Sequence, residues 1–186
     1  ESQKMINKIY KYKHVKFIDL SADFRIQDSK VFKKWYNTMH TSKNLIKDSI
    51  YAISEFQKKD LSKYRIIANP GCYPTSVQIP LIPLLKKKFI KEKNIIIDSK
   101  SGYSGAGRNF KSKFKHKNIS SAIHGYGVIK HRHMAELDQE FNKIDKNITY
   151  TFSPHLIPTF RGILTTIHVE LKPNVSVKKI HSFLKK

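Results

Sequence analysis

Several kinds of residue are scarce in this sequence, and each scarcity excludes a class of protein. The 186 residues contain one cysteine, Cys72, so an internal disulfide and a secreted disulfide-rich scaffold are both excluded. No apolar run approaches the roughly 20 residues that a membrane-spanning helix needs. The opening residues are basic and lack the apolar region of a signal peptide. We therefore expect a cytoplasmic protein with no membrane partner.

Acidic residues are also scarce. Only 14 Asp and Glu stand against 36 Lys and Arg, which gives a formal net charge of +22. Such a charge is typical of a nucleic-acid-binding module. The lysines are spread along the chain together with many Asn and Ile, however, and the basic runs at 85–93 and 109–117 match no nucleic-acid-binding motif. We expect a general compositional bias, non-specific retention on polyanions at low salt, and no specific nucleic-acid partner.

Hydrophobic residues make up 39% of the chain, which is enough for a packed core. The apolar pattern predicts strands at the start of 15–24 and at 65–68, 94–99, 148–158 and 162–171, and helices at 28–40, 74–89, 133–144 and 177–186. Pro80 and Pro83 are expected to kink or shorten the second helix. The mixture of strands and helices predicts an α/β or α+β fold.

The single cysteine lies in the segment ANPGCYPTS (68–76), between a predicted strand and a helix opened by Pro74 and Thr75. Unpaired N–H groups at a helix start favour an anion, so this position is expected to lower the pKa of the thiol. Gly71 permits a sharp turn and leaves room for a substrate. A small buried hydrophobe is the ordinary alternative. The layout favours a nucleophile that forms a thioester beside N–H groups able to hold an oxyanion.

A thiol nucleophile needs an acid/base partner, and the segment HRHMAE (131–136) offers one. In an extended segment His131 and His133 point to one face and Arg132 to the other, while Glu136 falls in the first turn of the next helix. Two surface histidines among nine, or a zinc site, are the alternatives. No further His or Cys ligand lies nearby in the sequence, so we expect no metal.

The segment SGYSGAGR (101–108) directly follows a predicted strand and holds three glycines. Its spacing matches neither the dinucleotide-binding G-x-G-x-x-G pattern nor a phosphate-binding P-loop. It is either an ordinary turn or a loop whose backbone approaches a cofactor or phosphate, with Arg108 as an anion clamp.

Taken together, these segments resemble one known family. NPGCYPTS (69–76), SGYSGAGR (101–108) and YGVIKHRHMAEL (126–137) occur in the order found in N-acetyl-gamma-glutamyl-phosphate reductases. FIDLSADFR (17–25) precedes them and SPHLIPTFRGILTTI (153–167) follows them, as in that family. The resemblance covers nearly the whole chain.

The resemblance implies a glyceraldehyde-3-phosphate dehydrogenase-like α+β catalytic domain together with the back half of a Rossmann domain. Residues 1–68 are expected to be the C-terminal part of a truncated NAD(P)-binding Rossmann domain. Residues 69–186 are expected to be most of the catalytic and dimerisation domain. The family's glycine-rich opening and its last helix have no counterpart here, so we expect a fragment that is inactive by itself.

The resemblance also implies a reaction. Members of this family reduce N-acetyl-L-glutamyl 5-phosphate with NADPH through a cysteine thioester, in arginine biosynthesis, and they form dimers or tetramers. We therefore expect NADP as cofactor, a small acyl phosphate as substrate, and a homo-oligomer. The catalytic positions correspond to Cys72 and to His133 or His131, with a preference for His133. The substrate-binding positions are expected at Arg25, Glu136 and Arg108, and the cofactor-binding positions at Gly102, Ser104 and Gly105.

Three alternatives remain. The first is a related semialdehyde dehydrogenase that acts on N-acetyl-aminoadipyl or aspartyl phosphate. The second is a basic nucleic-acid-binding module, and the third is an inactive fragment with a structural role.

Overall fold

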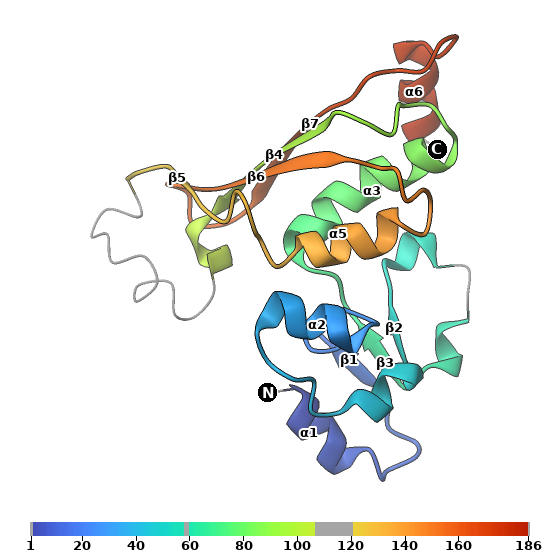
Figure 1. Cartoon of the computed structure of the whole chain (residues 1–186), viewed down its shortest axis with the longest axis vertical. Helices are drawn as coiled ribbons and strands as arrows, with labels where there is room; N and C mark the ends of the chain where they lie inside the picture. The colour runs from blue at the N-terminus through green and yellow to red at the C-terminus, as the bar shows by residue number, and fades with distance from the viewer. Residues whose placement is uncertain (1, 58–59, 107–120, 186) are drawn as a thin grey trace.

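The computed structural model describes residues 2–57, 60–106 and 121–185, and it contains two β-sheets with helices between them (Figure 1). The smaller sheet has three parallel strands in the order β1-β3-β2, formed by Phe17–Asp19, Ile66–Ala68 and Ser49–Tyr51. The larger sheet has four strands in the order β5-β6-β4-β7. The predicted mixture of strands and helices is confirmed.

The smaller sheet is built by the first 68 residues. It is accompanied by helices α1 (Ser2–Ile9) and α2 (Ser29–Tyr36) and by the short 3-10 helices Lys43–Asp48, Ser54–Phe56 and Leu61–Lys63. Helix α2 lies within the predicted range 28–40, and its cap is Asp28, whose carboxylate accepts the N–H groups of Lys30 and Val31. Ile66 and Ala68 of the central strand are fully buried. The sequence analysis missed β2, which has only three residues and no alternating pattern to mark it.

The larger sheet is built by the second half of the chain. Strands β4 (Ile95–Gly102) and β6 (Tyr150–Ile157) pair in parallel, and β7 (Ile163–His168) and β5 (His124–Gly125) pair antiparallel at the two edges. Burial alternates along β4: Ile95 and Ile97 are fully buried, whereas Ile96 is 48% exposed. The sheet therefore has one face against the core and one face turned outward.

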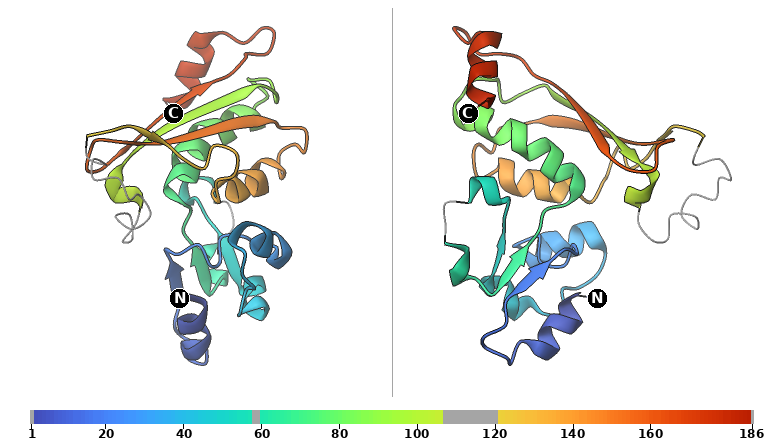
Figure 2. Two further views of the ribbon diagram at one scale, coloured as in Figure 1. Left: turned by 60° about the vertical axis from the view of Figure 1, so that its left-hand side comes forward. Right: turned by 180° about the vertical axis from the view of Figure 1, so that it is seen from behind.

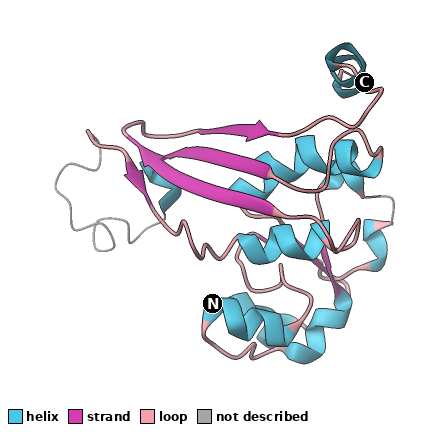
Figure 3. Cartoon of the chain, turned by 45° about the horizontal axis from the view of Figure 1, so that its top comes forward, coloured by secondary structure: helices cyan, strands magenta, loops and turns pink. Residues whose placement is uncertain are grey.

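Helices α3 (Cys72–Lys86) and α5 (Met134–Phe141) lie on the same side of the larger sheet, between it and the smaller sheet (Figures 2 and 3). The 3-10 helix Tyr103–Ala106 follows β4, and α6 (Val177–Leu184) begins after the cap Ser176. The main core joins α3 and α5 to the inner face of β4 and β6. None of the described helices combines the length and the apolar character that crossing a lipid bilayer requires.

Helix α3 differs from the prediction in two respects. It begins at Cys72 itself, with Gly71 as its cap, and it continues for 15 residues through Pro80 and Pro83. The helix ends at Lys86, three residues before the predicted end, but neither proline ends it. Val77, Leu81 and their neighbours are buried against the larger sheet and α5, and this packing outweighs the two lost backbone hydrogen bonds. The kink stays a prediction. Strand β3 ends at Ala68, so the chain passes from the smaller sheet to helix α3 through residues 69–71, immediately before Cys72.

Candidate active site

Cys72 is exposed at the start of α3 and faces a cavity of about 420 Å³, here called the Cys72 cavity. The cavity is lined by Trp35, Asn37, Cys72, Tyr73, Gly105, Ala106, Tyr126, Gly127, Lys130, His131, Arg132 and His133. The structure thus brings the thiol and both predicted histidines to one cavity, although 58 or more residues separate them in the chain. The alternative of Cys72 as a buried core residue is wrong.

The thiol of Cys72 has opposing electrostatic neighbours. Protein atoms packed around the sulfur raise its pKa above the ordinary value, even though one side of the residue is open. The backbone N–H groups of Tyr73 and Cys72 and the charge of Arg25 lower it, and the charge of Glu136 raises it further. The net direction is upward, so the predicted lowering of the thiol pKa is wrong for this chain. Burial thus favours the protonated form of the Cys72 thiol.

His133 is buried beside the turn that precedes Cys72. A Cβ atom added to Gly71 would lie 2.7 Å from His133 Nε2, so the imidazole rests directly against the Gly71 backbone. Burial, followed by the charges of His131, Arg25 and Arg132, lowers the pKa of His133 to about 2. The ring is therefore neutral, and its Nδ1 is buried without a hydrogen-bond partner among the described residues.

His131 has a different hydrogen-bond pattern. Its Nδ1 accepts the backbone N–H of His133 at 3.2 Å, and its ring meets Tyr73 and Tyr126 edge-on. Burial and then the charge of Arg132 lower the pKa of His131 to about 4, so this ring is neutral as well. Because Nδ1 accepts, the remaining proton sits on Nε2. His131 is thus set to donate a hydrogen bond, whereas His133 has a ring nitrogen able to accept a proton.

Residues 131–133 form a turn and not the extended segment that the sequence analysis expected. The N–H of Met134 bonds the carbonyl of His131 at 2.9 Å, and that of Ala135 bonds the carbonyl of Arg132 at 3.3 Å. The prediction that Arg132 lies on the face opposite the histidines is therefore wrong, since residues 131, 132 and 133 all line the Cys72 cavity. Arg132 and the neighbouring Lys130 are exposed and give the cavity positive charge.

Arg25 and Glu136, expected to bind substrate, form a buried pair and do not line the Cys72 cavity. Arg25 donates to the carbonyls of Asn69 and Leu20, and its Nη1 lies 3.4 Å from Glu136 Oε1. The Glu136 side chain is fully buried and accepts the N–H of Gly71 at 2.8 Å. Burial raises the pKa of Glu136, and the charge of Arg25 and the N–H of Gly71 oppose this. These contacts indicate that Arg25 and Glu136 position the turn before Cys72. Direct contact of either residue with substrate stays a prediction.

The residues of the glycine-rich loop (101–108) differ in whether they reach the Cys72 cavity. The N–H groups of Gly102 and Ser104 bond the carbonyls of Gly162 and Phe160, so neither is available to a ligand. A Cβ at Gly102 would collide with the backbone of Arg161 at 2.7 Å, which explains the glycine by packing. Of the three predicted cofactor positions, Gly105 alone lines the Cys72 cavity. Arg108 lies outside the described residues.

Several residues that line the Cys72 cavity were not predicted from the sequence. Trp35 and Asn37 come from α2 and the residue after it, and Tyr126 comes from the segment after β5. No spacing rule links these positions to Cys72, and only the aromatic character of Trp35 hinted at burial. Among the described residues, no three His, Cys, Asp or Glu side chains are arranged to hold a metal ion.

Comparisons with known proteins agree with this geometry. Residues 72–186 match the family described as "Semialdehyde dehydrogenase, dimerisation domain". The chain is 47% identical over 92% of its length to N-acetyl-gamma-glutamyl-phosphate reductase of Afipia carboxidovorans, covering 49% of that protein. It is 44% identical over 92% of its length to a probable chloroplastic N-acetyl-gamma-glutamyl-phosphate reductase of Arabidopsis thaliana, covering 43% of it. The chain thus spans about half the length of the curated relatives it matches.

Solved structures show the same fold. The structure of aspartate semialdehyde dehydrogenase II from Vibrio cholerae matches 98% of this chain with a TM-score of 0.65 at 16% identity, over 57% of its own length. Aspartate semialdehyde dehydrogenase from Francisella tularensis matches 100% of this chain with a TM-score of 0.67 at 11% identity, over 59% of its own length. The predicted fold class, with a catalytic domain like that of glyceraldehyde-3-phosphate dehydrogenase, is confirmed.

Proposed function

This chain belongs to the semialdehyde dehydrogenase family, and from that premise we propose that it carries the catalytic residues of an N-acetyl-gamma-glutamyl-phosphate reductase. The reaction is the NADPH-dependent reduction of N-acetyl-L-glutamyl 5-phosphate to N-acetyl-L-glutamate 5-semialdehyde, in arginine biosynthesis. The observation that carries the proposal is the meeting of the single thiol, Cys72, with two neutral imidazoles in one positively charged cavity.

The first chemical step follows from the charge states of these groups. Cys72 begins as a protonated thiol and His133 as a neutral imidazole, so proton transfer accompanies the attack of sulfur on the acyl carbon. The S–C bond forms, the bond between the acyl carbon and the phosphate oxygen breaks, and inorganic phosphate leaves. The thiol proton passes to His133. The product is a thioester on Cys72.

The second half of the reaction uses the same groups in reverse. When bound, NADPH supplies the hydride that reduces the thioester to a thiohemiacetal. The S–C bond then breaks to release the aldehyde, and the sulfur recovers its proton. His131, whose Nε2 carries a proton, is suited to donate a hydrogen bond to the substrate oxygen or phosphate.

The substrate itself strengthens the base. A pKa of about 2 makes His133 a weak proton acceptor in the absence of ligand. An acyl phosphate brings negative charge into the cavity beside Lys130 and Arg132, and nearby negative charge raises the pKa of an imidazole. Bound substrate therefore makes His133 a better acceptor for the thiol proton.

The cavity fits a nicotinamide ring on one side. Ala106 forms part of its wall and presents only a methyl group, which leaves room for a flat ring near Cys72. Gly105 also lines the cavity, but its glycine is explained by packing, because an added Cβ would lie 2.7 Å from Ser101 Oγ. The N–H groups of Gly102 and Ser104 are already bonded, so the loop contributes shape and not backbone hydrogen bonds at those positions. We propose that the assembled protein is a homo-oligomer, as the description of the matched family as a dimerisation domain supports.

The test uses the full-length protein in the reverse direction, with phosphate and NADP⁺. N-acetylglutamate semialdehyde, N-acetyl-aminoadipate semialdehyde and aspartate semialdehyde are compared as substrates. We expect the highest kcat/KM with N-acetylglutamate semialdehyde and loss of turnover in Cys72→Ser. A preference for aspartate semialdehyde would assign a different substrate, and turnover that survives in Cys72→Ser would rule out the thioester.

A further inference from the structure

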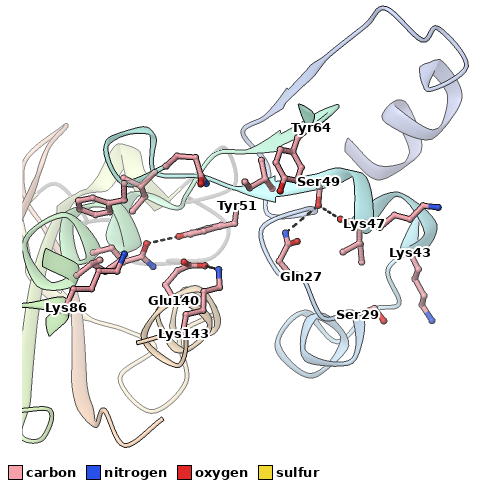
Figure 4. Close-up of a pocket in the computed structure, with 17 residues that line it drawn as sticks. Gln27, Ser29, Lys43, Lys47, Ser49, Tyr51, Tyr64, Lys86, Glu140 and Lys143 are labelled. Atoms are coloured by element: carbon pink, nitrogen blue, oxygen red, sulfur yellow. Dashed lines mark hydrogen bonds and ion pairs between the residues drawn. The ribbon is translucent and has the colours of Figure 1, made fainter. Parts of the chain in front are cut away.

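Tyr51 connects the smaller sheet to the buried carboxylate near Cys72. It is the last residue of β2, and its ring lines a second cavity, of about 840 Å³, on the side of the molecule where β2 faces α3 and α5 (Figure 4). The residue is only 6% exposed. Its hydroxyl lies 3.1 Å from Glu136 Oε2 and 3.2 Å from Gln78 Oε1. Tyr51 therefore belongs to the wall between this cavity and Glu136.

The Tyr51 hydroxyl has one proton and two acceptors. Gln78 donates its amide N–H to the backbone carbonyl of Glu136 at 3.2 Å, which leaves the Gln78 oxygen as the other acceptor for Tyr51. A hydrogen bond to an ionised carboxylate is roughly twice as strong as one to a neutral amide. The proton is therefore directed to Glu136 whenever that carboxyl is ionised.

The carboxylate of Glu136 also contacts the residues around Cys72. The same oxygen that Tyr51 meets, Oε2, accepts the N–H of Gly71, the residue directly before the thiol. The other oxygen, Oε1, faces Arg25 at 3.4 Å and His133 Nε2 at 3.9 Å. One fully buried carboxylate thus contacts the turn before the nucleophile and the imidazole beside it.

We propose that Tyr51 is a positioning residue for the thiol site: by donating to Glu136 it favours the ionised carboxylate and holds it against the N–H of Gly71, and so sets the environment of Cys72. The inference rests on the proposed function in taking Cys72 as the nucleophile. Its consequence is that a residue of the smaller sheet tunes a thiol at the start of α3 without touching it.

The single cysteine makes the test direct, because alkylation of this chain by iodoacetamide reports Cys72 alone. The rate of alkylation is measured against pH in the parent, in Tyr51→Phe, in Glu136→Gln and in the double variant. Removing the Tyr51 hydroxyl disfavours the ionised carboxyl, and less negative charge beside the thiol favours thiolate. We expect the alkylation midpoint to shift to lower pH in Tyr51→Phe, and to shift no further when Tyr51→Phe is added to Glu136→Gln.

Tyr150→Phe is the matched control. Tyr150, the first residue of β6, donates to Asp138 at 2.7 Å. This is also a phenol–carboxylate hydrogen bond to a residue of α5, and neither residue lines the Cys72 cavity. This variant should lose comparable stability and leave the alkylation midpoint unchanged. Site-specific 3-fluorotyrosine at position 51 keeps the ring and strengthens the donor, so it should shift the midpoint to higher pH even if Tyr51→Phe folds poorly.

Several results would overturn the inference. They are an unchanged or raised midpoint in folded Tyr51→Phe, an equal shift in Tyr150→Phe, or a Tyr51→Phe shift that persists in the Glu136→Gln background. Alkylation needs neither substrate nor cofactor. Failure of the Tyr51 inference therefore leaves the proposed reductase activity standing, and failure of that activity leaves the alkylation result interpretable.

Discussion

Replacing Gly71 by alanine adds one methyl group at the tightest point of the site. The backbone at Gly71 (φ −65°, ψ 157°) is open to any residue, so the cost of the change is purely steric. The new Cβ would lie 2.7 Å from His133 Nε2, 2.9 Å from His133 Cδ2 and 2.9 Å from Glu136 Oε1, whereas ordinary contacts start at 3.4 Å. The imidazole and the carboxylate must each retreat by about half an ångström or more, and both are enclosed by buried neighbours.

The expected effects follow from that displacement. Overpacking of a buried site costs about 1–3 kcal/mol, which for a chain of this size lowers the unfolding temperature by about 2–12 °C. Misplacing a catalytic group by on the order of 1 Å costs on the order of 100-fold in rate. We therefore expect kcat of the full-length protein with Gly71→Ala to fall by about that factor, measured by NADP⁺ reduction, with the loss of unfolding temperature measured by circular dichroism.

Gly125→Ala is the control for this prediction. Its added Cβ would meet His155 at 3.6 Å, an ordinary contact, so the unfolding temperature and kcat should stay close to those of the parent. If Gly71→Ala also kept the parent's unfolding temperature and kcat, His133 and Glu136 would not be packed against Gly71, and the geometry proposed for the site would be refuted.

The remaining predictions concern the charges of the Cys72 cavity. Because the thiol pKa is raised, Cys72 should react with iodoacetamide at pH 7 more slowly than a free peptide thiol; a faster rate would restore the helix-start argument. Arg132→Met should raise KM for the acyl phosphate about tenfold through loss of one charged hydrogen bond, with kcat little changed, and an unaltered KM would remove Arg132 from substrate binding. His131 has a folded-state pKa of about 4 against 6.5 unfolded, so the unfolded chain gains its proton first and stability falls as pH drops from 6.5 to 4. His131→Gln should reduce that fall by up to about 3 kcal/mol in urea unfolding, and an identical pH dependence in the two proteins would contradict the assignment.

The sequence was most informative where chemistry depends on neighbouring residues. Cys72 at a helix start follows from the Asn-Pro-Gly turn before it and from Pro74 after it, and the structure confirms that position. The helix that begins after Asp28 and the strand that includes Ile95 were predictable for the same reason, since helix starts and short apolar runs are local patterns.

Contacts between distant segments could not be predicted from local sequence patterns. Glu136 meets Gly71 across 65 residues and Tyr51 across 85, and no periodicity links these positions. The thiol pKa was mispredicted because the helix-start N–H groups were considered without the burial that opposes them. The direction of Arg132 was mispredicted because an extended backbone was assumed where the chain turns. Burial by distant segments reversed the first inference, whereas the second failed because the local backbone forms a turn.

The only tryptophan and the only cysteine of this chain line the same cavity from different segments. Trp35 belongs to α2 beside the smaller sheet, and Cys72 begins the helix that packs under the larger one. A fluorescent acceptor attached to Cys72 would therefore form an optical pair with Trp35 without any mutation. Its energy transfer would disappear when α2 separates from α3, which gives a spectroscopic signal for the docking of the two sheets that is independent of catalysis.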